Sequence, residues 1–164
     1  MRPLLLLSFS FAAVLMTAPQ CCAQIDAQKA LTQIGDFMVG SWTPASQQDK
    51  DAPLKHVYTW ALNKKFVRTN GELDPEPWHG YMGVDLESNQ LGWWGFFADG
   101  TSGVLYLKKL EESEWVFDGS DFGPKGKFRR VVTIKPGDGK LHSKIEDTLN
   151  GETTVIEEDW VRHR

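Results

Sequence analysis

The sequence predicts a mainly β protein: a single antiparallel up-and-down β-barrel of about nine or ten strands, preceded by a short N-terminal helix. Two observations support this prediction. After Met38 the spacing of apolar residues changes from a helical pattern to the alternation of strands. From there on, turn signals such as Asn70-Gly71, Asp99-Gly100 and Asn150-Gly151 recur at short intervals and leave no long crossovers. Sequential hairpins wind naturally into a closed sheet, because closure removes exposed strand edges; a two-sheet sandwich is the competing architecture.

The elements follow in order along the chain. Apolar residues at three-and-four spacing predict one amphipathic helix from Asp26 to Met38. Runs of β-branched and aromatic residues between turn signals then predict the strands. These are expected at Ser41–Pro44, Lys55–Leu62, Phe66–Leu73, Gly80–Leu86, Gly92–Phe97, Gly103–Leu110, Trp115–Ser120, Lys127–Lys135, Lys140–Leu149 and Thr153–Arg162.

The first residues carry the parts of a secretory signal peptide. Arg2 supplies the positive start, residues 4–16 form an apolar stretch, and small residues surround Ala23. A membrane-spanning helix needs roughly 20 apolar residues, and polar residues with Pro19 interrupt this stretch early. We therefore expect a signal peptide over residues 1–23, an exported domain over residues 24–164 that is periplasmic or secreted, and no transmembrane span.

Both cysteines of the chain, Cys21 and Cys22, lie in this leader. The residues before them lack the pattern of a bacterial lipoprotein signal, so cleavage after Ala23 is preferred to a lipid anchor at either cysteine. Cleavage leaves a domain without thiols, which excludes disulfides, a Cys nucleophile and Cys-ligated metals. Loss of Arg2 also takes the formal net charge from -4 to -5, and an acidic domain is a poor partner for nucleic acid or anionic membranes.

Gly40-Ser41-Trp42 directly follows the predicted helix and opens the first strand. This arrangement resembles the entrance of lipocalin-like (calycin) barrels, in which the Trp plugs the closed end. The segments Tyr58-Thr59-Trp60, Lys65-Phe66-Val67 and 80–85 are similar to those of a bacterial family of exported lipocalin-like domains with no assigned function. The resemblance covers most of the chain after the leader. Its motifs are structural, so it implies a fold rather than an activity.

Nitrobindin-like haem barrels also begin with Gly-x-Trp, but they continue with further glycines and supply an axial His from a late strand. Here Thr43-Pro44-Ala45 follows Trp42, and the late histidines are His142 and His163. This departure argues against haem, for which His142 would be the better-placed ligand. The four histidines show no metal-ligand spacing, so no metal site is predicted.

Alternation along a barrel strand also indicates which polar residues share the interior with the apolar ones. The rule places four charged residues inside: Arg68 with Phe66, Arg130 with Val132 and Ile134, Asp147 with Ile145, and Glu158 with Trp160. The phase of the last strand stays open, because Val155 and Val161 support the opposite one.

Buried charges must be paired or hydrated, so this set has two interpretations. One is an internal structural ion-pair network. The other is a ligand site in which Arg130 or Arg68 offers its guanidinium to a carboxylate or similar anion. Aromatic side chains would complete such a site by stacking on a flat or apolar ligand, and the candidates are Tyr58, Trp60 and Trp94, with Trp93 as the alternative to Trp94.

No catalytic motif is present: Gly-x-Ser-x-Gly, a phosphate-binding glycine loop and His-Glu-x-x-His are all absent. We therefore expect a binding protein for a small apolar or amphipathic molecule held in a barrel cavity. One alternative is a cyclase, isomerase or hydratase that uses Asp147 or Glu158 as a proton shuttle. Another is a filled barrel that acts through protein interaction at its surface.

Overall fold

A computed structural model of the protein describes residues 24–48, 54–73 and 76–163. The expected signal peptide, with Cys21 and Cys22, lies outside the described residues. Those that are described form the helix α1 (Ala27–Met38), the short 3-10 turn η1 (Ala45–Gln47) and ten strands. The strands are β1 (Gly40–Pro44), β2 (His56–Ala61), β3 (Phe66–Leu73), β4 (Glu76–Asp85), β5 (Gln90–Phe97), β6 (Ser102–Leu110), β7 (Trp115–Gly123), β8 (Gly126–Pro136), β9 (Lys140–Leu149) and β10 (Glu152–Arg162).

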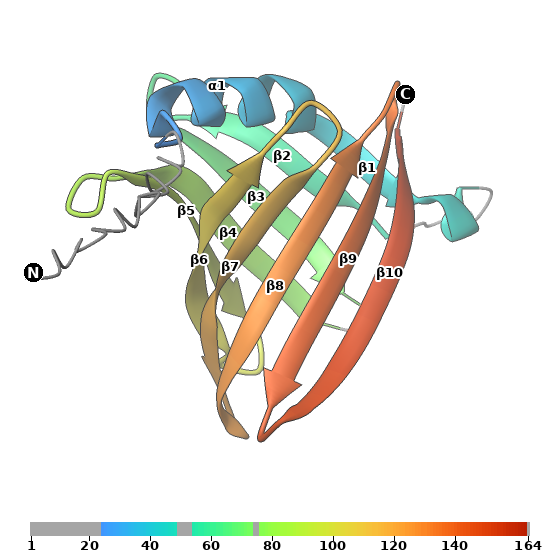
Figure 1. Ribbon diagram of the computed structural model, residues 1–164. Coiled ribbons are helices and arrows are strands. Elements are labelled where there is room, and N and C mark those ends of the chain that lie inside the picture. The colour runs from blue at the N-terminus through green and yellow to red at the C-terminus, as the bar shows by residue number, and fades with distance from the viewer. Residues whose placement is uncertain (1–23, 49–53, 74–75, 164) are drawn as a thin grey trace, which may run out of the picture.

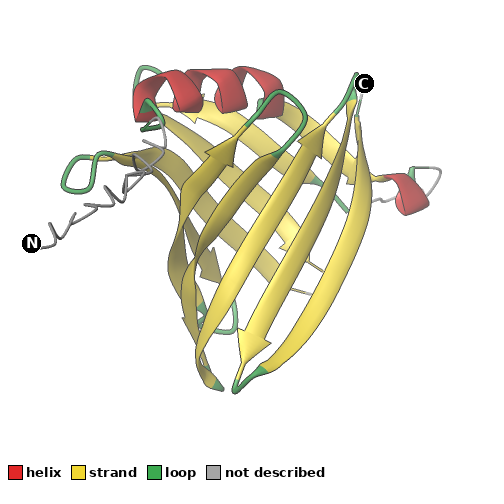
Figure 2. Ribbon diagram, in the orientation of Figure 1, coloured by secondary structure: helices red, strands yellow, loops and turns green. Residues whose placement is uncertain are grey.

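The ten strands close into one antiparallel barrel (Figures 1 and 2), which confirms the predicted architecture in place of a sandwich. Each strand pairs with its neighbours in the chain, and β1 closes the circle by pairing with β10, where Trp42 lies opposite Arg162. Most strand bounds lie within two residues of the predicted ones, but two strands differ more. β4 begins at Glu76 rather than Gly80, and β7 continues to Gly123, past Ser120.

α1 lies across one end of the barrel (Figure 1). The Asp26 carboxylate caps its first turn by accepting a hydrogen bond from the backbone N–H of Lys29 at 3.0 Å. The helix buries one face, with Leu31 and Ile34 completely enclosed. Gly35 belongs to this face, and a Cβ there would overlap the ring of Trp60. The apolar face that the sequence spacing predicted therefore packs against the barrel, and α1 covers this end, which we call the closed end.

Trp42 ties the helix to the first and last strands at this end. Its indole Nε1 donates a hydrogen bond to the carbonyl of Met38 at 2.7 Å. The Arg162 guanidinium lies 4.6 Å from the centroid of the Trp42 ring and donates to the carbonyls of Val39 and Phe37 at 2.7 and 2.6 Å. The contact of this cation with the indole ring and its hydrogen bonds to two carbonyls at the end of α1 all stabilise the packing of the helix on this end of the barrel.

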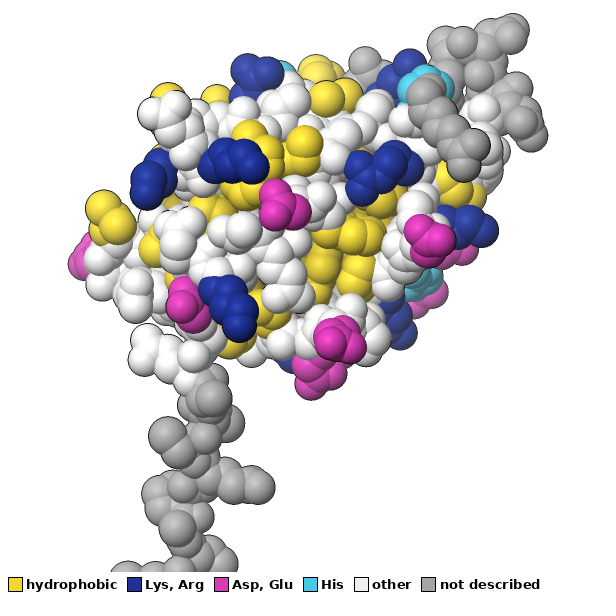
Figure 3. All heavy atoms as spheres, turned by 90° about the horizontal axis from the view of Figure 1, so that it is seen from above, with side chains coloured by type: hydrophobic (Ala, Val, Ile, Leu, Met, Phe, Trp, Pro, Cys, Tyr) yellow, Lys and Arg dark blue, Asp and Glu magenta, His cyan; other side chains and the backbone are white. Residues whose placement is uncertain are grey.

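The outer surface mixes residue types. Seen from the α1 end, hydrophobic side chains show between charged side chains of both signs (Figure 3). Larger apolar side chains are exposed in turns, such as Leu62 and Leu86, and on strands, such as Phe96 and Phe122. Over the part of the chain that the structure describes, the one α-helix, α1, is too short to cross a membrane.

Candidate functional site: a cavity inside the barrel

Three glycines on neighbouring strands remove side chains from one part of the inner wall. Gly80 of β4 pairs with Gly95 of β5, and Gly95 pairs with Gly103 of β6. Larger side chains use this space. A Cβ at Gly103 would overlap the carboxylate of Asp121, and a Cβ at Gly80 would lie 3.0 Å from the ring of Trp78. The row of glycines therefore gives room to bulky groups on both sides of it.

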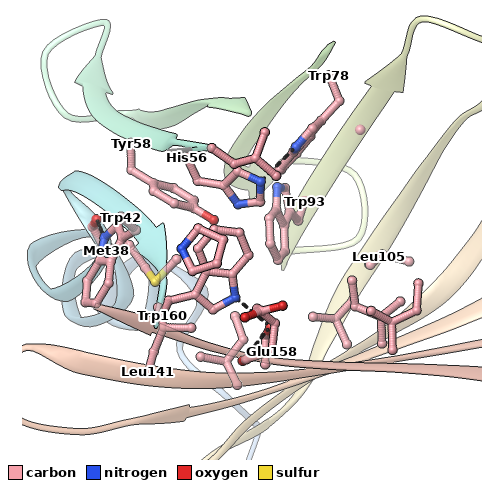
Figure 4. A pocket seen from close by; sticks show the side chains of 18 of the residues that line it. Met38, Trp42, His56, Tyr58, Trp78, Trp93, Leu105, Leu141, Glu158 and Trp160 are labelled. Carbon is pink, nitrogen blue, oxygen red and sulfur yellow. Dashed lines mark hydrogen bonds between the residues drawn. The ribbon is translucent and has the colours of Figure 1, made fainter. Parts of the chain in front are cut away.

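The interior holds a cavity of about 250 Å³. One part of its wall is aromatic and the rest is mostly aliphatic (Figure 4). The aromatic side chains are Trp42, Tyr58, Trp78, Trp93, Phe97 and Trp160, and the aliphatic ones include Leu105, Val132, Leu141 and Ile145. The sequence-based alternative of a completely filled barrel therefore does not describe this interior.

The aromatic wall is held in place by contacts between its own rings. His56 stacks on Trp160 with ring centroids 4.2 Å apart and meets Trp78 edge to face at 5.4 Å. Trp78 also stacks on Phe97 at 5.7 Å and donates its indole N–H to His56 Nε2 at 3.4 Å. The indole of Trp160 donates to Ser143 Oγ at 2.9 Å. Because these rings have fixed neighbours, this part of the wall is ordered before any ligand enters.

A cluster of three charged residues forms another part of the interior. Arg130 donates from Nε and Nη2 to the two carboxylate oxygens of Asp147, both at 2.7 Å, and its Nη1 lies 2.8 Å from Asp121 Oδ2. The guanidinium also lies over the rings of Phe97 and Phe128, whose centroids are 5.3 and 5.2 Å away. All three guanidinium nitrogens are thus bonded to carboxylates. A ligand anion would have to displace one of them.

Burial sets the protonation behaviour of the interior groups. The side chain of Asp121 is only 4% exposed, and burial raises the pKa of its carboxyl although the charge of Arg130 opposes the shift. Burial lowers the pKa of Arg130, but its hydrogen bonds to Asp147 and the charge of Asp121 outweigh this effect and leave the pKa above its ordinary value. Burial also raises the pKa of Tyr58 far above the usual tyrosine value, so its hydroxyl is neutral at physiological pH.

For the last three strands, alternation predicted correctly which side chains face the interior. Arg130, with Val132 and Ile134, lines the cavity, and Glu158 lines it with Trp160, which settles the phase of β10. Asp147 faces the same side as Arg130, which it bonds. Glu158 is half-buried, and its Oε1 accepts a hydrogen bond from Ser46 Oγ of η1 at 3.2 Å. Tyr58 lines the cavity as expected.

The inward placement of Arg68 is wrong. Its neighbours Val67 and Thr69 are fully buried, whereas Arg68 is exposed on the outer face of β3. Phe66 gave the opposite phase because a strand that begins with two apolar residues fits both registers. The ligand-facing position given to Trp94 is also corrected, since its neighbour Trp93 lines the cavity.

Two further candidates lie away from the cavity. Trp60 shares the phase of Tyr58, but it reaches the closed end and packs against Gly35 of α1. His142 is the residue considered for haem. It alternates with the cavity residues Leu141 and Ser143, and its Nδ1 lies 2.9 Å from the exposed Asp159 carboxylate. This position does not offer the His142 ring to the cavity.

The site residues that were not singled out from the sequence include His56, Trp78 and Asp121. Tyr58 was chosen as an aromatic residue, and alternation from it would also have given His56, two residues earlier. Trp78 and Asp121 lay outside the predicted strands, although the spacing of Trp115 and Phe117 continues to Asp121.

Within residues 24–48, 54–73 and 76–163, no group of three or more His, Asp or Glu side chains is arranged to hold a metal ion. A comparison with protein-family models gives no match, and a comparison with curated proteins gives none either.

Proposed function

We propose that the protein is an exported binding protein for a small apolar or amphipathic molecule, which the barrel holds in its cavity. The observation that carries this proposal is the internal space of about 250 Å³ beside a wall of mutually fixed aromatic rings. Concave, largely apolar sites with a few placed polar groups are typical of small-molecule binding. Here Tyr58, Ser143 and Glu158 are the polar groups that would orient the ligand.

The volume limits the size of the ligand. Pockets for drug-sized molecules range from roughly 300 to 1,000 Å³. A cavity of about 250 Å³ lies just below that range and favours a molecule with a single ring or a short chain. A tetrapyrrole such as haem is much larger than this space.

Export and a lipocalin-like relationship belong to the same proposal. Residues 1–23 have the composition of a signal peptide, which supports export. The hydrogen bond of Trp42 to Met38, the last residue of α1, supports the lipocalin-like resemblance of Gly40-Ser41-Trp42.

A calorimetric titration with single-ring and short-chain alcohols tests binding, with 3-phenylpropan-1-ol as the first probe. In the variant Ile145→Trp the larger ring occupies the cavity, so binding should be lost. The matched control is Glu146→Trp, the same substitution one residue later and on the outer face of β9, which should leave the affinity unchanged. Equal affinities in the two variants, or no binding of any probe to the unaltered protein, would reject the proposal.

The enzyme alternative uses the same space, and Glu158 is the better placed of its two proton-shuttle candidates. Both oxygens of Asp147 accept bonds from Arg130, which keeps this carboxylate from acting as a base. Glu158 faces the cavity, and the bond that its carboxylate makes within the described part of the chain is a long one from Ser46. A bound molecule that the protein converts, and that Glu158→Gln binds without converting, would favour the enzyme over the binding protein.

A further inference from the structure

We propose that the ligand of this cavity is an organic cation: an ammonium group attached to a single ring or a short apolar chain. The inference rests on the proposed function, since it assigns a charge to the molecule that the cavity would bind. It replaces the anion that the sequence suggested as the partner of Arg130.

The first argument is the charge of the wall. Among the described residues that line the cavity, Arg130 is the one side chain with a permanent positive charge. It faces Asp121 and Asp147, and Glu158 lies in the same interior, which is one positive charge against three carboxylates. The excess is formally two negative charges, and one remains if Asp121 carries a proton. A ligand anion would meet repulsion here and no unoccupied guanidinium edge, whereas a cation would be attracted.

The second argument is the chemistry of the rings. Aromatic faces attract cations, and the attraction grows as the cation is desolvated. Arg130 already makes such contacts, since its guanidinium lies 5.3 Å from the ring of Phe97, which lines the cavity, and 5.2 Å from the ring of Phe128 beside it. Trp78, Trp93 and Trp160 line the adjoining space (Figure 4). An ammonium group leaving water would be compensated by these rings and by a carboxylate.

The third argument is the position of Glu158. Its hydrogen bond to Ser46 places it beside η1, and Ile156, two residues earlier on β10, lines the cavity although it is 56% exposed. Among the described residues, the cavity is therefore exposed to solvent on this side. Met38 and Trp42 line the opposite, covered end. A bound amphiphile would hold its ammonium at Glu158 and extend its ring toward Met38.

Three probes of one shape separate charge from size: 3-phenylpropylamine, 3-phenylpropan-1-ol and 3-phenylpropanoate. Isothermal titration calorimetry at pH 7 should give a dissociation constant for the amine about tenfold below that of the alcohol, and about a hundredfold below that of the carboxylate. This comparison uses only the unaltered protein, so it does not depend on the folding of a variant.

Two charge-matched variants locate the effect. Glu158→Gln should reduce the ratio of amine to alcohol affinity about tenfold. Glu157→Gln removes the same charge from the exposed face of β10 and should preserve the ratio. An alcohol that binds as tightly as the amine, or a carboxylate that binds tightest, would overturn the cation while leaving a binding protein. No binding of any of the three would remove the proposed function as well.

Discussion

The interior ion-pair cluster makes the sharpest stability prediction, through the variant Arg130→Leu. The substitution removes three charge-assisted bonds and leaves Asp121, whose side chain is 4% exposed, without a counter-ion. Asp147 is 26% exposed, so water can replace part of its lost partner. Breaking a buried ion pair costs about 3–5 kcal/mol. With one carboxylate still partly hydrated, we expect the lower end, about 3 kcal/mol.

The neighbouring arginine provides the control. Arg129 makes the same two-point contact with Asp118, at 2.9 and 2.7 Å, but on the outer face with 63% of its side chain exposed. Urea unfolding followed by tryptophan fluorescence measures both variants. Arg130→Leu should lose about 3 kcal/mol of unfolding free energy, or about 10 °C in the melting temperature for a domain of this size. Arg129→Leu should change far less, because water competes for an exposed ion pair.

A double variant tests the cause of this loss. Adding Asp121→Asn to Arg130→Leu replaces the uncompensated charge with a neutral amide, and should recover part of the stability. Equal effects of the two arginine substitutions, or a neutral effect of Arg130→Leu, would refute the interior placement of the cluster. Absence of any recovery in the double variant would refute the account based on an unpaired Asp121.

Three further results are expected. In an NMR titration the Asp121 carboxyl should titrate above the ordinary value of 3.8, because burial raises its pKa, and the Asp118 carboxyl below it, because its hydrogen bonds to Arg129 lower its pKa. Asp121 therefore lowers the stability of the fold as pH rises from 3.8 through the folded pKa of its carboxyl. Asp118 stabilises the fold above pH 3.8, and this stabilisation is lost as pH falls through the folded pKa of its carboxyl. Shifts in the reverse directions would contradict this reasoning. Gly103→Ala should reduce the melting temperature strongly, because the added Cβ overlaps the Asp121 carboxylate. An unchanged melting curve would contradict the role of the glycine row in making room for larger side chains. Arg162→Ala should cost about 1–2 kcal/mol in urea unfolding through two lost carbonyl bonds and the lost contact with the Trp42 ring; a stability equal to that of the unaltered protein would show that Arg162 does not hold the closed end.

Alternation in the sequence predicted the interior where one face of a strand is uniformly apolar. Val132 and Ile134 on β8 gave Arg130 correctly, and Ile145 on β9 gave Asp147. The strand number followed from the turn signals because each turn in this chain joins strands that pair with each other.

The same rule failed where apolar residues occupy both faces. Phe66 and Val67 are adjacent, as are Trp93 and Trp94, and only packing against the rest of the barrel decides which member of each pair turns inward. Asp121 was missed because the predicted strand ended at Ser120, one residue before it.

The shape of the cavity was beyond sequence reasoning. It depends on the alignment of Gly80, Gly95 and Gly103 across three strands, and this alignment is a property of strand register. The engagement of Arg130 by two carboxylates depends on register in the same way, since Asp121 lies on β7 and Asp147 on β9. Local patterns gave the charges, and tertiary structure decided that they bond each other.

The most direct test of the central claim is native mass spectrometry of the protein purified from its own host, beside the variants Ile145→Trp and Glu146→Trp. We predict that the unaltered protein and Glu146→Trp retain a small molecule that is released on gentle activation, and that Ile145→Trp carries none because its cavity is filled. A molecule retained equally by all three proteins would place binding outside the barrel. If all three proteins show only the mass of the chain without a ligand, and no phenylpropyl probe binds, the claim of a ligand-binding cavity would be contradicted.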